Sequence, residues 1–79
     1  MFDDMRDESN KIKGFAMNEL NEFRKAQNLN INELCRMSGK LDNSDYHKFL
    51  KGSKFPSLPT ILTIAKSMGY TLKIVFKKD

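Results

Sequence analysis

Residues that start and stop helices recur at short intervals along most of the chain. Polar N-cap residues precede the segments and glycines end them: the starts are Asn30, Asp42 and Ser57, and the stops are Gly39, Gly52 and Gly69. Between these positions apolar residues follow a three- and four-residue spacing, which is the period of one helix face. The pattern predicts a mainly α-helical domain built from short helices.

The chain of 79 residues is long enough for one small domain and too short for two. A core of this size is marginal, and oligomerisation would add buried surface. The single cysteine, Cys35, excludes an internal disulfide and suits a reducing cytoplasm. No stretch approaches the roughly 20 apolar residues of a membrane span, and the acidic, polar start does not resemble a secretory signal. We therefore expect a cytoplasmic protein with no membrane partner.

Charge is distributed unevenly between the start of the chain and the rest. Residues 1–11 carry four carboxylates and two cations, a formal charge of −2, whereas the whole chain carries +4, so residues 12–79 carry +6. A basic body suggests a polyanionic partner such as nucleic acid. The same charges would also serve solubility alone, and charge by itself leaves both interpretations open.

The first two predicted helices cover residues 12–28 and 31–38. The first has an expected inward face made of Ile12, Ala16, Leu20, Phe23 and Ala26 or Gln27. Residues 1–11 form an acidic segment that either is flexible or extends this helix. Asn30 and Glu33 match a capping box at the start of the second helix, which buries Leu34 and Cys35. We interpret Cys35 as a core residue, since a reactive thiol needs exposure and an electropositive setting.

The third predicted helix, residues 43–51, has two contrasting faces. Its inward residues are Tyr46, Phe49 and Leu50, and its outward residues are Asn43, Ser44, His47, Lys48 and Lys51. Asparagine can pair bidentately with adenine, serine and histidine donate or accept hydrogen bonds, and lysine reaches guanine or phosphate. The alternative interpretation is an ordinary solvated helix face.

A fourth helix follows Ser57 and tolerates Pro59 in its first turn, where no intrahelical donor is lost. Its expected apolar face comprises Leu58, Ile61, Leu62, Ile64, Ala65 and Met68. Gly69 ends it. Residues 12–69 are thus predicted to form the helical domain.

The remaining residues, 70–79, alternate between polar and apolar side chains and are predicted to form one β-strand. A lone strand leaves backbone donors and acceptors unpaired, so it is expected to pair with the same strand of a second copy. The apolar residues of this dimer strand are Leu72, Ile74 and Phe76. The alternative is a strand-like tail that packs on the chain's own helices.

The second and third predicted helices are separated by a four-residue linker that begins at Gly39, a spacing that fits helix-turn-helix geometry. In that motif the second helix enters the major groove and residues near its start contact base edges. The expected base contacts are Asn43, Ser44, His47 and Lys48.

Residues 20 to about 75 resemble the Cro/repressor-type (XRE family) helix-turn-helix domain. The matching stretches are FRKAQNLNINELCRMSG and YHKFLKGSKFPSLPTILTIAKSMGYTLKI. Phe23-Arg24 matches a Leu-Arg pair late in the first helix, Leu34-Cys35 a Leu-Ala pair, and the stretch after Pro56 a Pro-Ser-Leu-x-Thr-Leu helix start. The resemblance implies a lambda-repressor-like fold of four to five helices. It also implies contacts to the DNA backbone from Lys40, Lys51, Ser53 and Lys54. Arg36 and Arg24 either join these contacts or form surface ion pairs.

The chain departs from the family pattern at the turn and at the start of the reading helix. Ile31 stands where the family often has a glutamine that contacts phosphate, and the interval from Gly39 to Gly52 is one residue longer. The register of the first base-reading positions is therefore open. Asp42 and Asp45 lie where phosphates should approach, and their charge would oppose binding unless they act as caps.

The ending IAKSMGYTLKI resembles antitoxins of the HigA and HipB type and addiction-module antidote proteins. This resemblance implies a bacterial or phage-encoded repressor, found on the nucleoid when bound to its operator, that represses its own operon and neutralises a toxin. The alternatives are a phage Cro-like repressor and a protein-interaction module that inhibits a partner without reading DNA. We expect no enzyme, cofactor or metal site, since no nucleophile–base pair, carboxylate pair, ligand cluster or phosphate-binding glycine loop is visible.

Overall fold

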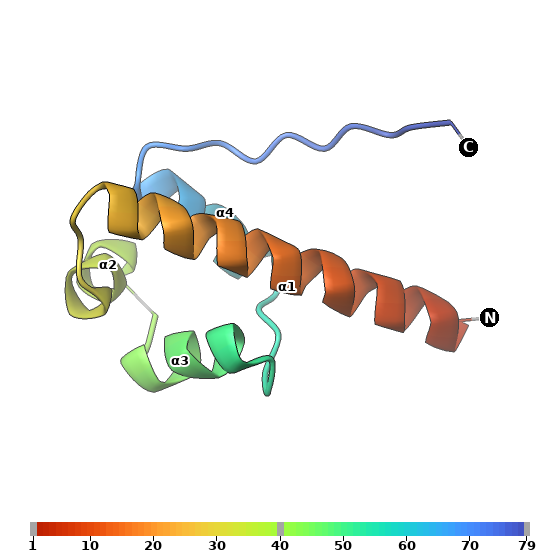
Figure 1. Ribbon diagram of the computed structural model, residues 1–79, viewed down its shortest axis with the longest axis horizontal. Coiled ribbons are helices and arrows are strands. Elements are labelled where there is room, and N and C mark those ends of the chain that lie inside the picture. The colour runs from red at the N-terminus through yellow and green to blue at the C-terminus, as the bar shows by residue number, and fades with distance from the viewer. Residues whose placement is uncertain (1, 40, 79) are drawn as a thin grey trace.

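The computed structural model describes residues 2–39 and 41–78, with side chains from Met5 onward. This part of the chain contains four helices and no strand (Figure 1). The helices are α1 (Phe2–Ala26), α2 (Ile31–Ser38), α3 (Asn43–Lys51) and α4 (Leu58–Ser67). The prediction of a mainly α-helical domain is confirmed, and the predicted bounds of the second and third helices match those of α2 and α3. No described helix combines the length and apolar character needed to cross a membrane.

Capping interactions explain why α2 begins and ends where it does. The Asn30 side chain accepts a hydrogen bond from the Glu33 backbone N–H at 2.7 Å, and the Glu33 carboxylate accepts one from the Asn30 N–H at 3.2 Å. This is the predicted capping box, which satisfies two backbone donors at the helix start. Gly39, with a φ of 82°, ends the helix in a conformation that other residues rarely adopt.

The core lies between the four helices and receives side chains from all of them. The buried residues are Met17, Leu20, Leu34, Cys35, Tyr46, Phe49, Ile61, Ile64, Ala65 and Met68. Every apolar residue assigned to the interior of α2 and α3 is buried or half-buried. In α4 the prediction was wrong for Leu58, which lies in the first turn at the edge of the core and is exposed.

The inward face of α1 differs from the predicted one. Ile12 is 66% exposed, whereas Met17, which the predicted stripe omits, is fully buried. The reason is the length of the helix, which begins at Phe2 and projects well beyond the other three helices (Figure 1). At Ile12 no other described helix packs against α1. The helical period is correct there, but the stripe that it predicts continues beyond the end of the core.

Residues 70–78, called the tail below, have no regular secondary structure, so the prediction of a strand is not borne out. The Tyr70 N–H donates to the Ala65 carbonyl at 2.9 Å, and the Tyr70 ring stacks on Phe23 with centroids 4.2 Å apart. Leu72 is half-buried, and the tail then leaves the body. A strand needs a hydrogen-bonded neighbour, and the described part of this single chain offers no second extended segment.

Candidate nucleic-acid interface

The helices α2 and α3 pack against each other and are separated by residues 39–42. Asp42 caps α3, accepting a hydrogen bond from the Ser44 N–H at 3.4 Å. Leu41 is half-buried and packs on the core, which anchors the turn. Lys40, expected to contact the DNA backbone, lies outside the described residues. The structure therefore has the helix spacing on which the predicted reading element depends.

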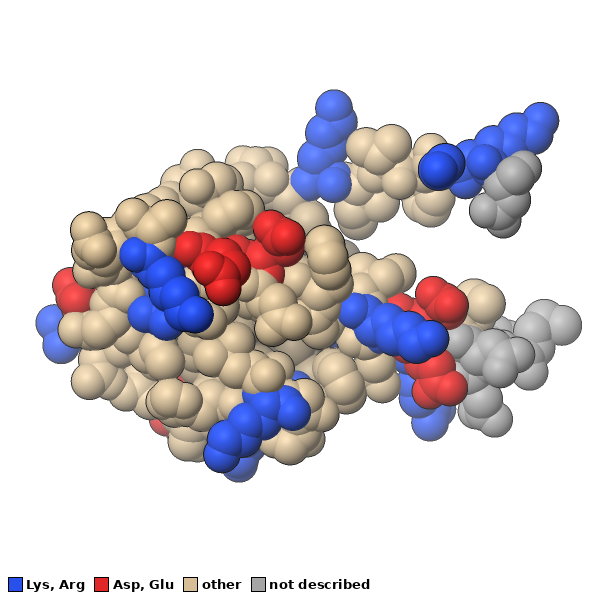
Figure 2. All heavy atoms as spheres, viewed as in Figure 1, with Lys and Arg blue, Asp and Glu red and all other residues tan. Residues whose placement is uncertain are grey.

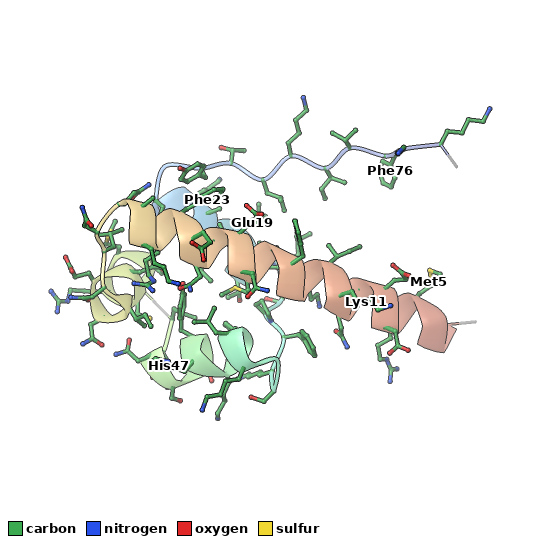
Figure 3. All side chains as sticks on the ribbon, in the orientation of Figure 1. Met5, Lys11, Glu19, Phe23, His47 and Phe76 are labelled. Atoms are coloured by element: carbon green, nitrogen blue, oxygen red, sulfur yellow. The ribbon has the colours of Figure 1, made fainter. Side chains whose placement is uncertain are left out.

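The side chains of α3 are distributed between the core and the surface, with Asn43, Asp45 and Leu50 half-buried between them. Tyr46 and Phe49 are buried, which fixes the rotation of the helix about its axis. The predicted base-contact residues Ser44, His47 and Lys48 are exposed, and Figure 3 shows His47 pointing away from the body. The remaining one, Asn43, is half-buried. Three of the four are thus brought together on one open face, and Asn43 lies at its margin.

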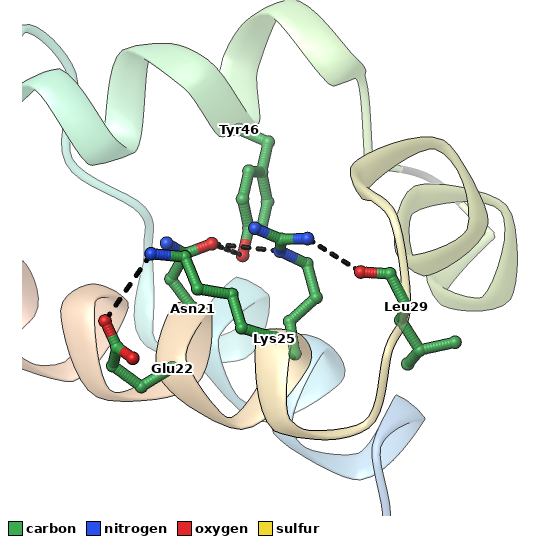
Figure 4. A network of polar contacts seen from close by, with 6 residues as sticks. Asn21, Glu22, Lys25, Leu29 and Tyr46 are labelled. Carbon is green, nitrogen blue, oxygen red and sulfur yellow. Dashed lines mark hydrogen bonds and ion pairs between the residues drawn. The ribbon is translucent and has the colours of Figure 1, made fainter.

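A polar network holds α3 against α1 (Figure 4). The Tyr46 hydroxyl donates to Asn21 Oδ1 at 3.0 Å, and Arg24 Nε donates to the same oxygen, also at 3.0 Å. Arg24 Nη1 donates to the Leu29 carbonyl at 2.7 Å. Arg24, a candidate DNA contact by sequence, is therefore committed to the connection between α1 and α2. The sequence signal that was missed is the i, i+3 spacing of Asn21 and Arg24 on the inward side of α1.

Burial alters the proton affinity of two core groups. Burial raises the pKa of Tyr46, and the nearby Arg24 guanidinium opposes that shift. Burial also raises the pKa of Cys35, with a smaller contribution from the carboxylate of Asp42. Both groups are held in their neutral forms at physiological pH. The buried, neutral thiol of Cys35 supports its interpretation as a core residue.

The two carboxylates that were expected to repel phosphate are both occupied. Asp42 caps α3, and Asp45 forms an ion pair with Lys54, whose Nζ lies 3.0 Å from Asp45 Oδ1. The pair joins the first turn of α3 to the loop that follows it. Lys54, predicted as a contact to the DNA backbone, is therefore partly neutralised by Asp45.

The other predicted backbone contacts lie on the surface around α3. Lys51 and Ser53 are exposed at the end of the helix, where the Ser53 hydroxyl donates to the Lys48 carbonyl at 3.4 Å. Arg36 is exposed in the last turn of α2. Exposed cations thus lie at the end of α3 and in the last turn of α2, and in the described residues the only carboxylate of α3 itself is the paired Asp45.

The predicted dimer residues have unequal environments. Leu72 is half-buried against the core, whereas Ile74 and Phe76 are exposed. Within this single chain the three residues are not brought together in a strand.

The described residues contain no cluster of three or more histidine, cysteine, aspartate or glutamate side chains that could hold a metal ion. A surface groove of about 770 Å³ separates the loop after α3 from α4, and its lining includes Phe55, Pro56 and Thr60. The hydroxyl of Thr60 is hydrogen-bonded to Ser57 at 3.0 Å, at the start of α4. Asp45 and Lys54, which pair with each other, and Ser57, which caps α4, also line this groove. The open face of α3 combines hydrogen-bonding and basic side chains, those of Ser44, His47 and Lys48.

Comparison with known proteins adds no further identification: no family model, no curated protein and no solved structure matches the chain.

Proposed function

We propose that the protein is a sequence-specific DNA-binding repressor that inserts α3 into the major groove. One observation carries the proposal: α3 is fixed by the buried Tyr46 and Phe49 while it presents Ser44, His47 and Lys48 to solvent. A reading helix needs one face packed rigidly against the core and an opposite, exposed face that can donate and accept hydrogen bonds.

The electrostatics around α3 support the same proposal. Acids near the start of the helix would repel phosphate, but Asp45 is paired with Lys54, and the Asp42 carboxylate lies at the positive end of the α3 dipole. Lys48 and Lys51 remain exposed on the helix, and no described ion pair involves them. Neutralisation of phosphates by such lysines releases counterions, so affinity should fall steeply as salt rises.

In its more specific form, the proposal is an autoregulatory antitoxin with a lambda-repressor-like helix-turn-helix domain. The support is the ordered set of motif residues from Phe23 to Ile74. Such a protein would act in the cytoplasm, on the nucleoid when bound, with its operator and a toxin as partners. A phage Cro-like repressor is the alternative. An adjacent small open reading frame whose toxicity is suppressed by co-expression would favour the antitoxin, and a phage lysogeny locus would favour the alternative.

The proposed repressor is a homodimer that uses residues 70–79 for pairing. Exposed Ile74 and Phe76, in a segment without regular secondary structure in the described chain, support this part of the proposal. A two-fold dimer places its two α3 helices on half-sites about 34 Å apart or a multiple of that distance, so the operator should be palindromic.

The first experiment selects binding sites from random duplex DNA and compares variants on the selected site. His47→Ala is expected to change the preferred bases, because the side chain lies on the open face of α3. Lys51→Ala is expected to weaken all sequences by a similar factor and to reduce the salt slope by about one. The measurement is fluorescence anisotropy across a salt series.

Absence of any enriched sequence, with random and promoter DNA bound equally at physiological salt, would rule out sequence-specific repression. Identical effects of His47→Ala on every sequence would rule out a base-reading role for this residue.

Asp45→Asn is expected to strengthen DNA binding by up to about tenfold, which is the order of one surface charge interaction. The substitution removes a negative charge from the first turn of α3 and releases Lys54 for phosphate. Its cost in stability should stay within about 1 kcal/mol, because the pair is on the surface. Anisotropy titration measures the affinity, and Glu22→Asn, which breaks the ion pair with Lys25 on α1, is the control. Weaker binding by Asp45→Asn would show that the ion pair orients Lys54 productively.

A protein-interaction module is the second candidate function, favoured by the exposed apolar residues Met5, Phe15 and Phe76. Here the start of α1 or the tail would bind and inhibit a partner without DNA. Deletion of residues 1–10 separates the two functions. Loss of toxin binding with intact DNA binding would assign this segment to the partner.

A further inference from the structure

The start of α1 and the tail leave the body of the molecule as two arms. They run in opposite chain directions along one side (Figure 1), and the space-filling view in Figure 2 shows open space between their far ends. Met5 and Phe76 lie toward the ends of these arms in Figure 3, and Phe76 is 93% exposed. Each arm therefore carries apolar side chains that the described part of the chain does not cover.

A groove of about 460 Å³ lies between α1 and the beginning of the tail. α1 contributes Ile12, Phe15 and Glu19 to its lining, and the tail contributes Tyr70 and Leu72. Phe15 is 68% exposed. The Glu19 carboxylate forms no ion pair with the described residues. The groove is thus mainly apolar, open to solvent and bordered by one unneutralised carboxylate.

We propose that this groove receives the tail of a second copy of the protein. The inference rests on the homodimer of the proposed function and adds the surface of α1 on which the partner's tail lies. The tail has the chemistry that the groove requires. Ile74 and Phe76 supply apolar side chains, Lys78 supplies charge for Glu19, and the backbone can pair with the first copy's tail.

The alternation of the tail fixes which side chains reach the groove. Tyr70, Thr71 and Leu72 line the groove where the tail meets the body. Beyond them, extended residues alternate between faces, so Ile74 and Phe76 lie on the same side of the tail as Leu72. In an antiparallel pair with its two-fold axis at Ile74, the partner's Phe76 lies opposite Leu72. The partner's Lys78 then lies opposite Tyr70, which lines the groove together with Glu19.

The distribution of lysines selects this register over its neighbour. With the axis at Val75, Lys73 would lie directly opposite the partner's Lys77, and like charges in that position destabilise a strand pair. With the axis at Ile74, Lys73 instead lies opposite the partner's Val75. The two-fold axis of the pairing therefore passes at Ile74. In each protomer, Ile74 then lies over the exposed apolar face of α1.

The first test substitutes Phe15→Asp and measures the dimer dissociation constant of the DNA-free protein by sedimentation. The constant is expected to rise at least about 100-fold, because each dimer would lose two buried phenylalanine side chains. Met37→Asp, at an apolar residue of α2 that is 52% exposed, is the matched control and should leave the constant unchanged. Circular dichroism checks that both variants stay folded.

The second test locates the axis by disulfide formation in a Cys35→Ala background. Ile74→Cys is expected to give a covalent dimer under mild oxidation, because directly opposite residues lie about 4.5–5.5 Å apart. Val75→Cys should stay reduced, because the two copies are then diagonal neighbours at about 7–8 Å, beyond disulfide reach.

A chain that sediments as a monomer at every accessible concentration overturns the inference. If Phe15→Asp has the same dimer dissociation constant as the unmodified chain, α1 is not part of the interface. If Val75→Cys cross-links more readily than Ile74→Cys, the register centred on Ile74 is wrong. If the dissociation constants and the cross-linking agree with the inference but the protein binds no DNA, the proposed function is wrong and the inference about the dimer stands.

Discussion

Replacing Tyr46 with alanine is expected to lower the free energy of unfolding by about 3–5 kcal/mol, the usual cost of deleting a large core aromatic. The Tyr46 side chain is fully buried, and its hydroxyl reaches Asn21 on α1. Domains of this kind are stable by only about 5–15 kcal/mol, so a large fraction of the variant should be unfolded on warming. Urea denaturation followed by circular dichroism measures the loss.

Tyr46→Phe separates packing from hydrogen bonding at the same site. It keeps the ring, so we expect a loss of about 1 kcal/mol, the net value of one hydrogen bond. Burial raises the pKa of Tyr46, so the folded state retains the proton more tightly than the unfolded state. The contribution of Tyr46 to the free energy of unfolding is therefore fully present below about pH 10 and is lost as pH rises above that value. The phenylalanine variant should show a weaker alkaline decline, and equal declines would assign the effect to other groups such as Cys35.

Reversing the charge of two exposed lysines on α3, in the double variant Lys48→Glu and Lys51→Glu, is expected to weaken DNA binding at least about 100-fold. Both side chains belong to the face proposed to approach the duplex, and the change brings four units of negative charge to it. The fold should persist, because both residues are exposed and helix-surface charge pairs contribute only about 0.2–0.5 kcal/mol each.

A variant with the same net charge tests whether the effect is local. Lys25→Glu with Lys66→Glu, at exposed residues of α1 and α4, also takes the formal charge from +4 to zero. It should lose far less affinity than the α3 variant. Equal losses from both double variants would mean that overall charge, not the α3 face, attracts DNA.

Local chemistry made the central part of the fold predictable. The Asn30–Glu33 capping box and the glycines at 39 and 52 mark where α2 and α3 begin and end, and these signals act within a few residues. The buried and exposed faces of α3 follow from the helical period alone. The open positions of Ser44, His47 and Lys48 were predictable for the same reason.

Features that depend on what lies beyond one helix were not predictable. The period places Ile12 on an inward stripe, but α1 has no neighbouring helix at that level. The pairing of Asp45 with Lys54 joins α3 to the next loop, which residue spacing does not reveal. Arg24 bonds the Leu29 carbonyl in the same way, through a turn whose shape depends on the folded chain. The tail has strand-like alternation but no neighbouring strand within the described chain.

The unbroken course of α1 from Phe2 to Ala26 has a thermodynamic consequence. One rigid helix carries both the arm with Ile12 and Phe15 and the network of Asn21 and Arg24 that positions α3. A ligand of the arm that favours one tilt of this helix would therefore alter the affinity of α3 for its own ligand. Such coupling is reciprocal, so occupancy of α3 would change the affinity of the arm by the same factor.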